Sequence, residues 1–161
     1  MKKEEKVKQE IIQNFGLAYK SFGLSKLMGH IVALLLSSNE PLSLDEISEA
    51  LGRSKGPVSQ IMRRLRDRHL IRKVWHTNSR KDYYEIEPGI FENAFRNNYE
   101  LIKANTRLSK QLLNKVQTLN SDKLKFLELR LIEMQKFYEL TEEYNEKFLE
   151  DWIKIREEIY K

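Results

Sequence analysis

The chain has 161 residues and a formal net charge of +5, with 33% charged and 40% hydrophobic residues. This length favours a single domain, and the absence of cysteine excludes a disulfide framework, thiolate chemistry and a zinc–thiolate site. The longest apolar run, residues 31–36, is far too short to span a membrane, and the first ten residues lack the apolar core of a secretory signal. We expect a cytoplasmic protein with no membrane partner.

Two helices are expected before residue 40. Helical spacing of apolar residues predicts an amphipathic helix over about residues 4–19. Ser25 can cap a second helix that ends near residue 37, and this helix is apolar on nearly all sides toward its end, as a core helix would be. His30 lies among these apolar residues, so we interpret it as a core or boundary histidine rather than a metal ligand.

Three aromatic residues in this region, Phe15, Tyr19 and Phe22, stand close in sequence to Gly16 and Gly23. Packing between the first two helices accounts for them. The alternative is an aromatic pocket for a small-molecule effector, because the face of an aromatic ring attracts a cation. Phe15, Tyr19 and Phe22 are therefore the candidate ligand pocket.

The centre of the chain, residues 42–86, has the signals of two short helices joined by a tight turn. Ser43 and Glu46 have the spacing of a capping box, and Gly52 suits the left-handed conformation at a helix end. Ser54 is the next N-cap candidate, and Pro57 fits the first turn of the helix that follows. Two helices joined in this way form a helix-turn-helix, whose second helix enters the major groove.

The second of these helices has an apolar face and a basic face. Residues 52–82 contain ten Lys or Arg and two acidic residues, a net charge of +8, whereas the rest of the chain carries −3. A basic block beside an acidic remainder is typical of phosphate binding, although a basic helix face is often only solvated. Small residues at the helix start would let a phosphate approach free backbone amides. The polar face consists of Lys55, Ser59, Gln60, Arg63, Arg64 and Arg66.

Two runs rich in β-branched and aromatic residues, 71–75 and 83–86, flank a polar loop. They predict a β-hairpin that carries Arg80 and Lys81 near its tip. An arginine there could enter a narrow minor groove, whose negative potential attracts it. The hairpin is the expected wing of a winged helix-turn-helix.

A long helical region is expected after residue 89. Apolar spacing predicts a helix over about residues 91–119 and, after a break at 120–122, a stripe over residues 124–159 that could be one helix or two. These helices cannot cover both their own stripes and the winged domain, so we expect a homodimer. The alternative is an intramolecular hairpin in a monomer. The candidate dimerisation residues are Ile11, Phe15, Phe95, Leu112, Leu124, Leu127, Leu131, Met134 and Tyr138.

Residues 43–84 contain the segments SLDEI, S-K-G-x-V-S and R-K-D-Y-Y, and on these the chain resembles the GbsR-type branch of the MarR transcriptional regulators. The resemblance covers about residues 15–88 and implies a DNA-binding regulator, and some members of that branch respond to quaternary ammonium compounds. Pro57 departs from the family, which more often has a small polar residue there. The implied DNA-binding residues are Ser54, Lys55, Gly56, Ser59, Gln60, Arg63, Arg64, Arg80 and Lys81, to which we add Ser43 at the start of the first helix.

The predicted fold is mainly α with a small β-hairpin wing. An N-terminal helix (1–22) that contributes to dimerisation precedes the winged domain (23–88) and a helical dimerisation region (89–161). The predicted function is that of a sequence-specific regulator that binds double-stranded DNA as a homodimer, with repression favoured. The competing class is a winged-helix module that docks an acidic protein. We expect no enzyme and no cofactor, because the sequence has no nucleophile–base pair, glycine-rich phosphate loop or metal-ligand spacing.

Overall fold

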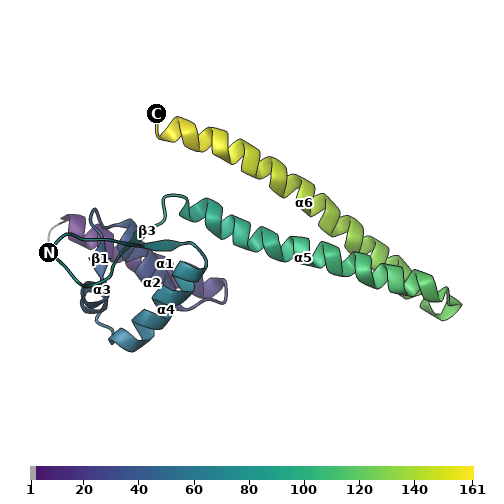
Figure 1. The fold of residues 1–161 in the computed structure, drawn as a ribbon, viewed down its shortest axis with the longest axis horizontal. Helices are drawn as coiled ribbons and strands as arrows, with labels where there is room; N and C mark the ends of the chain where they lie inside the picture. Colours follow the sequence, from purple (N-terminus) through teal and green to yellow (C-terminus); the bar gives the residue numbers. More distant parts are fainter. Residues whose placement is uncertain (1–2) are drawn as a thin grey trace. The chain divides into compact units, whose positions relative to one another are not determined.

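Helices make up most of the chain, and three short strands form a small sheet, in agreement with the predicted fold class (Figure 1). The computed structural model describes residues 3–161, so the first two residues of the predicted N-terminal region lie outside the described part. The chain divides into two units, one that ends at Ala94 and one that runs Phe95–Lys161. Among the described residues, no helix is both long and apolar enough to cross a membrane.

Four helices and the sheet build the first unit. The helices and strands are α1 (Lys3–Ser21), α2 (Lys26–Leu36), β1 (Leu42–Ser43), α3 (Leu44–Ala50), α4 (Lys55–Asp67), β2 (Ile71–Val74) and β3 (Tyr83–Ile86). The sheet is antiparallel with the order β1-β3-β2. The predicted hairpin is therefore confirmed, and the two-residue strand β1 adds an edge that the sequence did not indicate.

The core of this unit is centred on α2. Its apolar residues are buried against α3, α4 and β2, and Ile31, Ile47 and Leu65 are fully inaccessible to solvent. Ser25 caps α2 as predicted, because its hydroxyl accepts a hydrogen bond from the Met28 amide. Burial of such side chains is the main source of stability of a domain of this size.

Two glycines allow α1 and α2 to approach closely. A β-carbon added at Gly29 would fall on the carbonyl oxygen of Phe15, and one added at Gly16 would fall on the His30 ring. His30 is half-buried, as expected for a boundary position, and burial lowers the pKa of its imidazole. The predicted packing of the first two helices is thus confirmed, with backbone against backbone at Gly29 and the His30 side chain against backbone at Gly16.

The second unit consists of two antiparallel helices (Figure 1). Helix α5 (Ile90–Leu119) ends at Asn120, whose φ of +44° reverses the chain, and a 3₁₀ turn η1 (Asp122–Leu124) leads into α6 (Lys125–Ile159). The region after residue 124 is thus one helix of 35 residues. Because the described chain folds back on itself here, the intramolecular hairpin that we had set against dimerisation is present.

Contacts along the hairpin hold α5 against α6. The Tyr99 hydroxyl donates a hydrogen bond to Glu146 at 2.9 Å, and the Phe95 and Phe148 rings lie 4.5 Å apart between centroids. Burial, followed by the bond to Glu146, raises the pKa of Tyr99 to about 12. Leu131 is buried within the same hairpin.

Candidate nucleic-acid interface

Helix α4 presents two faces of opposite character. Its apolar side chains Val58, Ile61, Met62 and Leu65 are buried in the core, as their spacing predicted. Gln60, Arg63, Arg64 and Arg66 are exposed on the other side, and Ser59 is half-buried. Within residues 3–161, Arg63, Arg64 and Arg66 form no ion pair. Such a face is rich in positive charge that no acidic group of the same unit neutralises.

The start of α4 is open to solvent. Ser54 is the N-cap residue by its backbone conformation, but its hydroxyl forms no capping hydrogen bond. Lys55 and Gly56 are exposed, and a β-carbon at Gly56 would meet no atom within 4 Å. Pro57 lies in the first turn, as predicted. This helix end therefore has free backbone N–H groups and room for an approaching anion.

The wing is joined to the helix-turn-helix by one carboxylate. Asp45 of α3 forms ion pairs with Lys55 at 2.7 Å and with Lys81 of the wing at 2.9 Å. The hydrogen bond from Lys55, followed by that from Lys81, lowers the pKa of Asp45 to about 2. The predicted wing residue Lys81 thus lies beside the start of α4, a proximity that 25 intervening residues conceal in the sequence.

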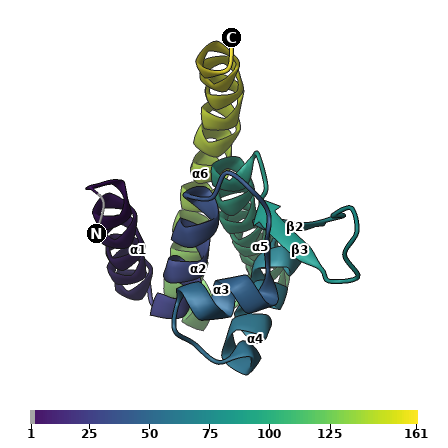
Figure 2. The ribbon, with the colours of Figure 1, turned by 90° about the vertical axis from the view of Figure 1, so that its left-hand side faces the viewer.

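The loop between β2 and β3 projects away from the helices of the unit (Figure 2). Arg80 is exposed in this loop, and Asn78 has a positive φ of 65°. His76 stacks on Tyr83 with ring centroids 4.5 Å apart, which orders the base of the loop. The loop therefore holds its arginine at an accessible, protruding position.

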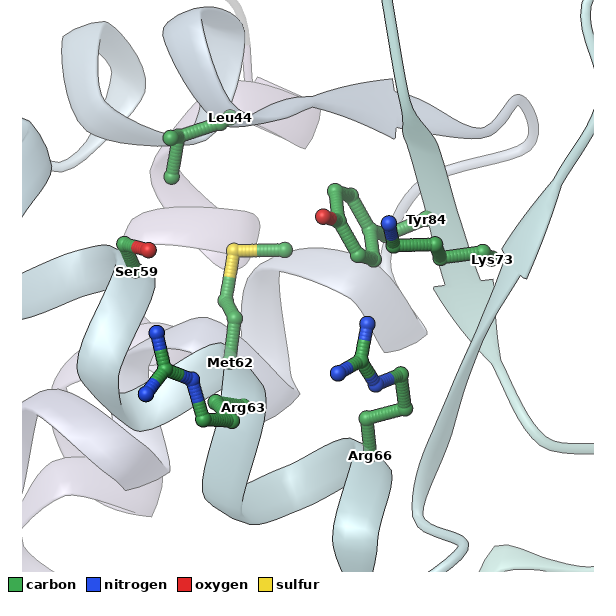
Figure 3. Close-up of a pocket in the computed structure, with 7 residues that line it drawn as sticks. All are labelled: Leu44, Ser59, Met62, Arg63, Arg66, Lys73 and Tyr84. Atoms are coloured by element: carbon green, nitrogen blue, oxygen red, sulfur yellow. The ribbon is translucent and has the colours of Figure 1, made fainter.

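A hollow separates α4 from the sheet (Figure 3). It has a volume of about 200 Å³. Sequence reasoning left Arg66, Lys73 and Tyr84 out of the candidate DNA-binding residues, although the spacing of Ser59, Arg63 and Arg66 places them on one stripe of α4. No sequence signal indicated the strand residues. The lining residues are Leu44, Ser59, Met62, Arg63, Arg66, Lys73 and Tyr84.

Ser43 is placed differently from the other candidate residues. Only 3% of it is exposed, and it forms the predicted capping box with Glu46. Its amide and hydroxyl both donate to the Glu46 carboxylate, and its hydroxyl accepts from the Glu46 amide. Because its polar groups are used inside the domain, we remove Ser43 from the candidate DNA-binding residues.

The three aromatic side chains of the candidate ligand pocket do not come together to form a pocket. Phe15 and Tyr19 pack against the core of the first unit, with ring centroids 6.5 Å apart, whereas Phe22 is 82% exposed. At that exposure Phe22 cannot enclose a ligand, so the packing interpretation describes Phe15 and Tyr19 correctly. Within residues 3–161, no cluster of His, Asp or Glu has the arrangement of a metal site.

The candidate dimerisation residues fall into three groups. Some are used inside the chain: Phe15 packs on the core, Phe95 contacts Phe148, and Leu131 is buried in the hairpin. Leu112 and Leu127 are exposed. The remaining ones, Ile11, Leu124, Met134 and Tyr138, are half-buried.

A mostly apolar groove of about 390 Å³ runs along the hairpin. Phe95 of α5 contributes one wall, and side chains of α6 contribute the rest. Phe137, Leu140, Tyr144 and Phe148 are each at least half exposed. Large apolar patches of this kind on a folded surface are typical of protein contacts. The α6 residues of the groove are Phe137, Leu140, Thr141, Tyr144, Asn145 and Phe148.

Comparison with known proteins agrees with this geometry. A family model described as winged helix-turn-helix DNA-binding matches residues 29–72, which include α3, α4 and the start of β2. The first unit is a winged helix-turn-helix domain. A crystal structure of a transcriptional regulator has the same fold, with a TM-score of 0.75 at 22% identity over 91% of this chain and 98% of that one.

Two curated relatives come from Bacillus subtilis (strain 168). The HTH-type transcriptional repressor OpcR is 26% identical over 114 residues, which are 69% of this chain and 62% of OpcR. YvaV, whose name gives it as a candidate HTH-type transcriptional regulator, is 30% identical over 88 residues, which are 55% of this chain and 50% of YvaV. The chain thus spans between half and two thirds of the length of these relatives.

Proposed function

We propose that this protein is a sequence-specific DNA-binding transcriptional regulator of the GbsR-like MarR type. The observation that carries the proposal is the unneutralised basic face of α4, which lies beside a protruding basic wing. Arg63, Arg64 and Arg66 have no acidic partner within residues 3–161. Phosphate oxygens or acceptor atoms of the bases would therefore supply hydrogen-bond partners for their guanidinium groups. The names of OpcR and YvaV support a role in transcription, and that of OpcR favours repression.

In this proposal α4 lies in the major groove. Gln60 would pair with adenine and Arg64 with guanine, because each can form two parallel hydrogen bonds to the edge of that base. Ser54, Lys55 and Gly56 would meet the backbone at the helix start, and Ser59 would contact an adjacent base or phosphate. Arg80 would enter the flanking minor groove, and Lys81 would contact its backbone.

The same proposal includes a homodimer. The hairpin buries one stripe of each helix yet leaves Phe137, Leu140 and Tyr144 more than half exposed, and a second copy would cover them in a symmetric contact. Two winged domains in one particle would meet successive major grooves about one helical turn apart. A ligand or stress signal would regulate binding by changing the separation of the two domains, since only one spacing fits the grooves.

The test is fluorescence anisotropy with a labelled duplex from the region upstream of the protein's own gene and with a scrambled duplex. Arg64→Ala should lose about 1–3 kcal/mol on the first duplex and relax discrimination between the two. Arg80→Ala should weaken binding as well. Arg107→Ala, an exposed position on α5, is the control and should bind like the wild type.

Salt dependence separates this function from its competitor. Affinity should fall steeply as salt rises, because each neutralised phosphate releases counterions. A wild-type protein with no affinity for duplex DNA at low salt would contradict the proposal and favour a module that docks an acidic protein.

A further inference from the structure

The hollow between α4 and the sheet has the composition of an anion site. Arg63 and Arg66 lie one helical turn apart on α4 and both line the hollow. Figure 3 shows Arg66 pointing toward Tyr84 and Lys73 of the sheet, whereas Arg63 points to the other side of Met62. Guanidinium groups stay charged in proteins, so the two arginines cannot relieve their mutual repulsion by losing a proton. An anion bound in the hollow would offset this repulsion.

The surroundings of these cations are uneven. Within residues 3–161, neither Arg63 nor Arg66 has an acidic partner, whereas Lys73 is bound to Asp82 at 2.5 Å and its ammonium lies 5.9 Å from the centre of the Tyr84 ring. Met62, which is nearly buried, and Leu44 contribute apolar walls. The unpaired charge is thus on the helix side, and the sheet side supplies a lysine already held in place.

We propose that this hollow is the seat of one DNA backbone phosphate, bound by Arg63 and Arg66 and approached by Lys73. The inference rests on the proposed function. If α4 occupies a major groove and the wing occupies the adjacent minor groove, the sugar–phosphate strand that separates the two grooves must pass between them. The hollow lies there, between α4 and the strands that carry the wing.

The seat divides the arginines of α4 by role. Arg63 and Arg66 line the hollow, so in this proposal they position the backbone and carry no sequence information. Gln60 and Arg64 do not line it and are left to read base edges. The position of the seat therefore defines which half of the basic face can give sequence discrimination.

The salt dependence of duplex binding tests the seat. Arg66→Gln should reduce the slope of log affinity against log salt by about 0.9 for each seat in the complex, since one phosphate contact is lost. The loss of affinity should be equal on upstream and scrambled duplexes. Arg107→Gln, which removes the same charge from α5, is the matched control and should keep the wild-type slope.

Neutral phosphate substitution locates the seat on DNA. In a duplex that the wild type protects, a single methylphosphonate at the phosphate between the major-groove and minor-groove contacts should weaken wild-type binding. The same duplex should bind Arg66→Gln no more weakly than the unmodified one, and the thermal unfolding midpoint of the variant should match that of the wild type.

Two results would overturn the inference. Equal salt slopes for wild type and Arg66→Gln, with wild-type binding intact, would remove the seat and leave the proposed function standing. Failure of the wild type to bind duplex DNA at low salt would remove both.

Discussion

The two units of this protein use apolar residues in different ways. In the winged domain the large aliphatic side chains of α2, α3 and α4 are enclosed, with Ile31, Ile47 and Leu65 fully buried. In the hairpin, two helices bury one narrow stripe and leave many large apolar side chains in solvent. The first unit has enough elements around α2 to close a core, whereas two helices alone cannot surround each other. One unit encloses its apolar side chains, and the other leaves a large share of them uncovered.

The largest effect is expected from a charge placed in the exposed groove of the hairpin. Leu140→Asp should weaken self-association on the order of 1,000-fold, because a symmetric contact would bury the charge twice. Analytical ultracentrifugation over a range of concentrations would measure it. Leu101→Asp, at a somewhat more exposed leucine outside the groove, is the control. A wild type that sediments as a monomer at all concentrations would contradict the proposal that the exposed groove of the hairpin forms a homodimer contact.

A pair of leucine truncations probes the closed core directly. Leu65→Ala should lower the free energy of unfolding by about 2–5 kcal/mol, because Leu65 is fully buried and its loss leaves a cavity. Leu129→Ala removes the same atoms from a side chain that is 65% exposed and should cost far less. Urea unfolding followed by circular dichroism, at a concentration where the chain is monomeric, compares them. Equal losses would mean that the two units are stabilised alike.

The close approach of α1 to α2 should be sensitive to one methyl group. Gly29→Ala should destabilise the winged domain by about 1–3 kcal/mol, since the new β-carbon falls on the Phe15 carbonyl and the helices must separate. Gly56→Ala, where nothing lies within 4 Å, should instead leave stability unchanged or raise it by up to about 1 kcal/mol. Calorimetric melting temperatures would compare the two variants, and a Gly29→Ala midpoint no lower than that of the wild type would disprove the contact.

The smallest effect is electrostatic, and one carboxyl group from each unit illustrates it. Asp45 in the winged domain and Glu139 in the hairpin both have a pKa near 2, below the usual 3.8 and 4.5. For Glu139 the causes are hydrogen bonds from Gln135 and then Lys136. Because both pKa values are lowered by folding, these contacts stabilise the protein above about pH 4.5, and their contribution is lost as the pH falls toward 2.

Carboxyl carbon NMR titration would measure these two pKa values. Asp45→Asn should remove the part of the acid-dependent stability that Asp45 contributes and leave the Glu139 titration unchanged. A midpoint for Asp45 near 3.8 would show that the tether between Lys55 and Lys81 does not persist in solution.

Local signals in the sequence predicted most of the fold. The capping box of Ser43 and Glu46, the positive φ of Gly52 and the place of Pro57 in the first turn of α4 were all confirmed, because each depends on neighbours within four residues. Strand β1 was missed, since two residues have no periodicity and pair with β3 only across about 40 intervening residues.

The candidate site was less predictable because it depends on contacts distant in sequence. The charge block indicated a basic surface, but neither the Asp45 tether nor the position of Lys73 opposite Arg66 could be deduced from spacing. The hairpin shows the same limit: apolar spacing identified Leu131 and Leu127 alike, yet only Leu131 is buried within the chain. Helix α6 has one apolar stripe that is buried in the hairpin and another that is exposed, and together they give a single periodic pattern. The sequence therefore cannot tell which residues belong to which stripe.

Ser43 has a further mechanical consequence. It is the final residue of β1, paired with Tyr83 at the start of β3, and also the N-cap of α3. No residue separates β1 from α3, so a displacement of β3, which carries one side of the wing, would act through β1 on the first turn of α3. Ser43 therefore belongs to both the sheet and the helix pair, and a displacement of β3 that pulled Ser43 out of place would also disturb the cap of α3.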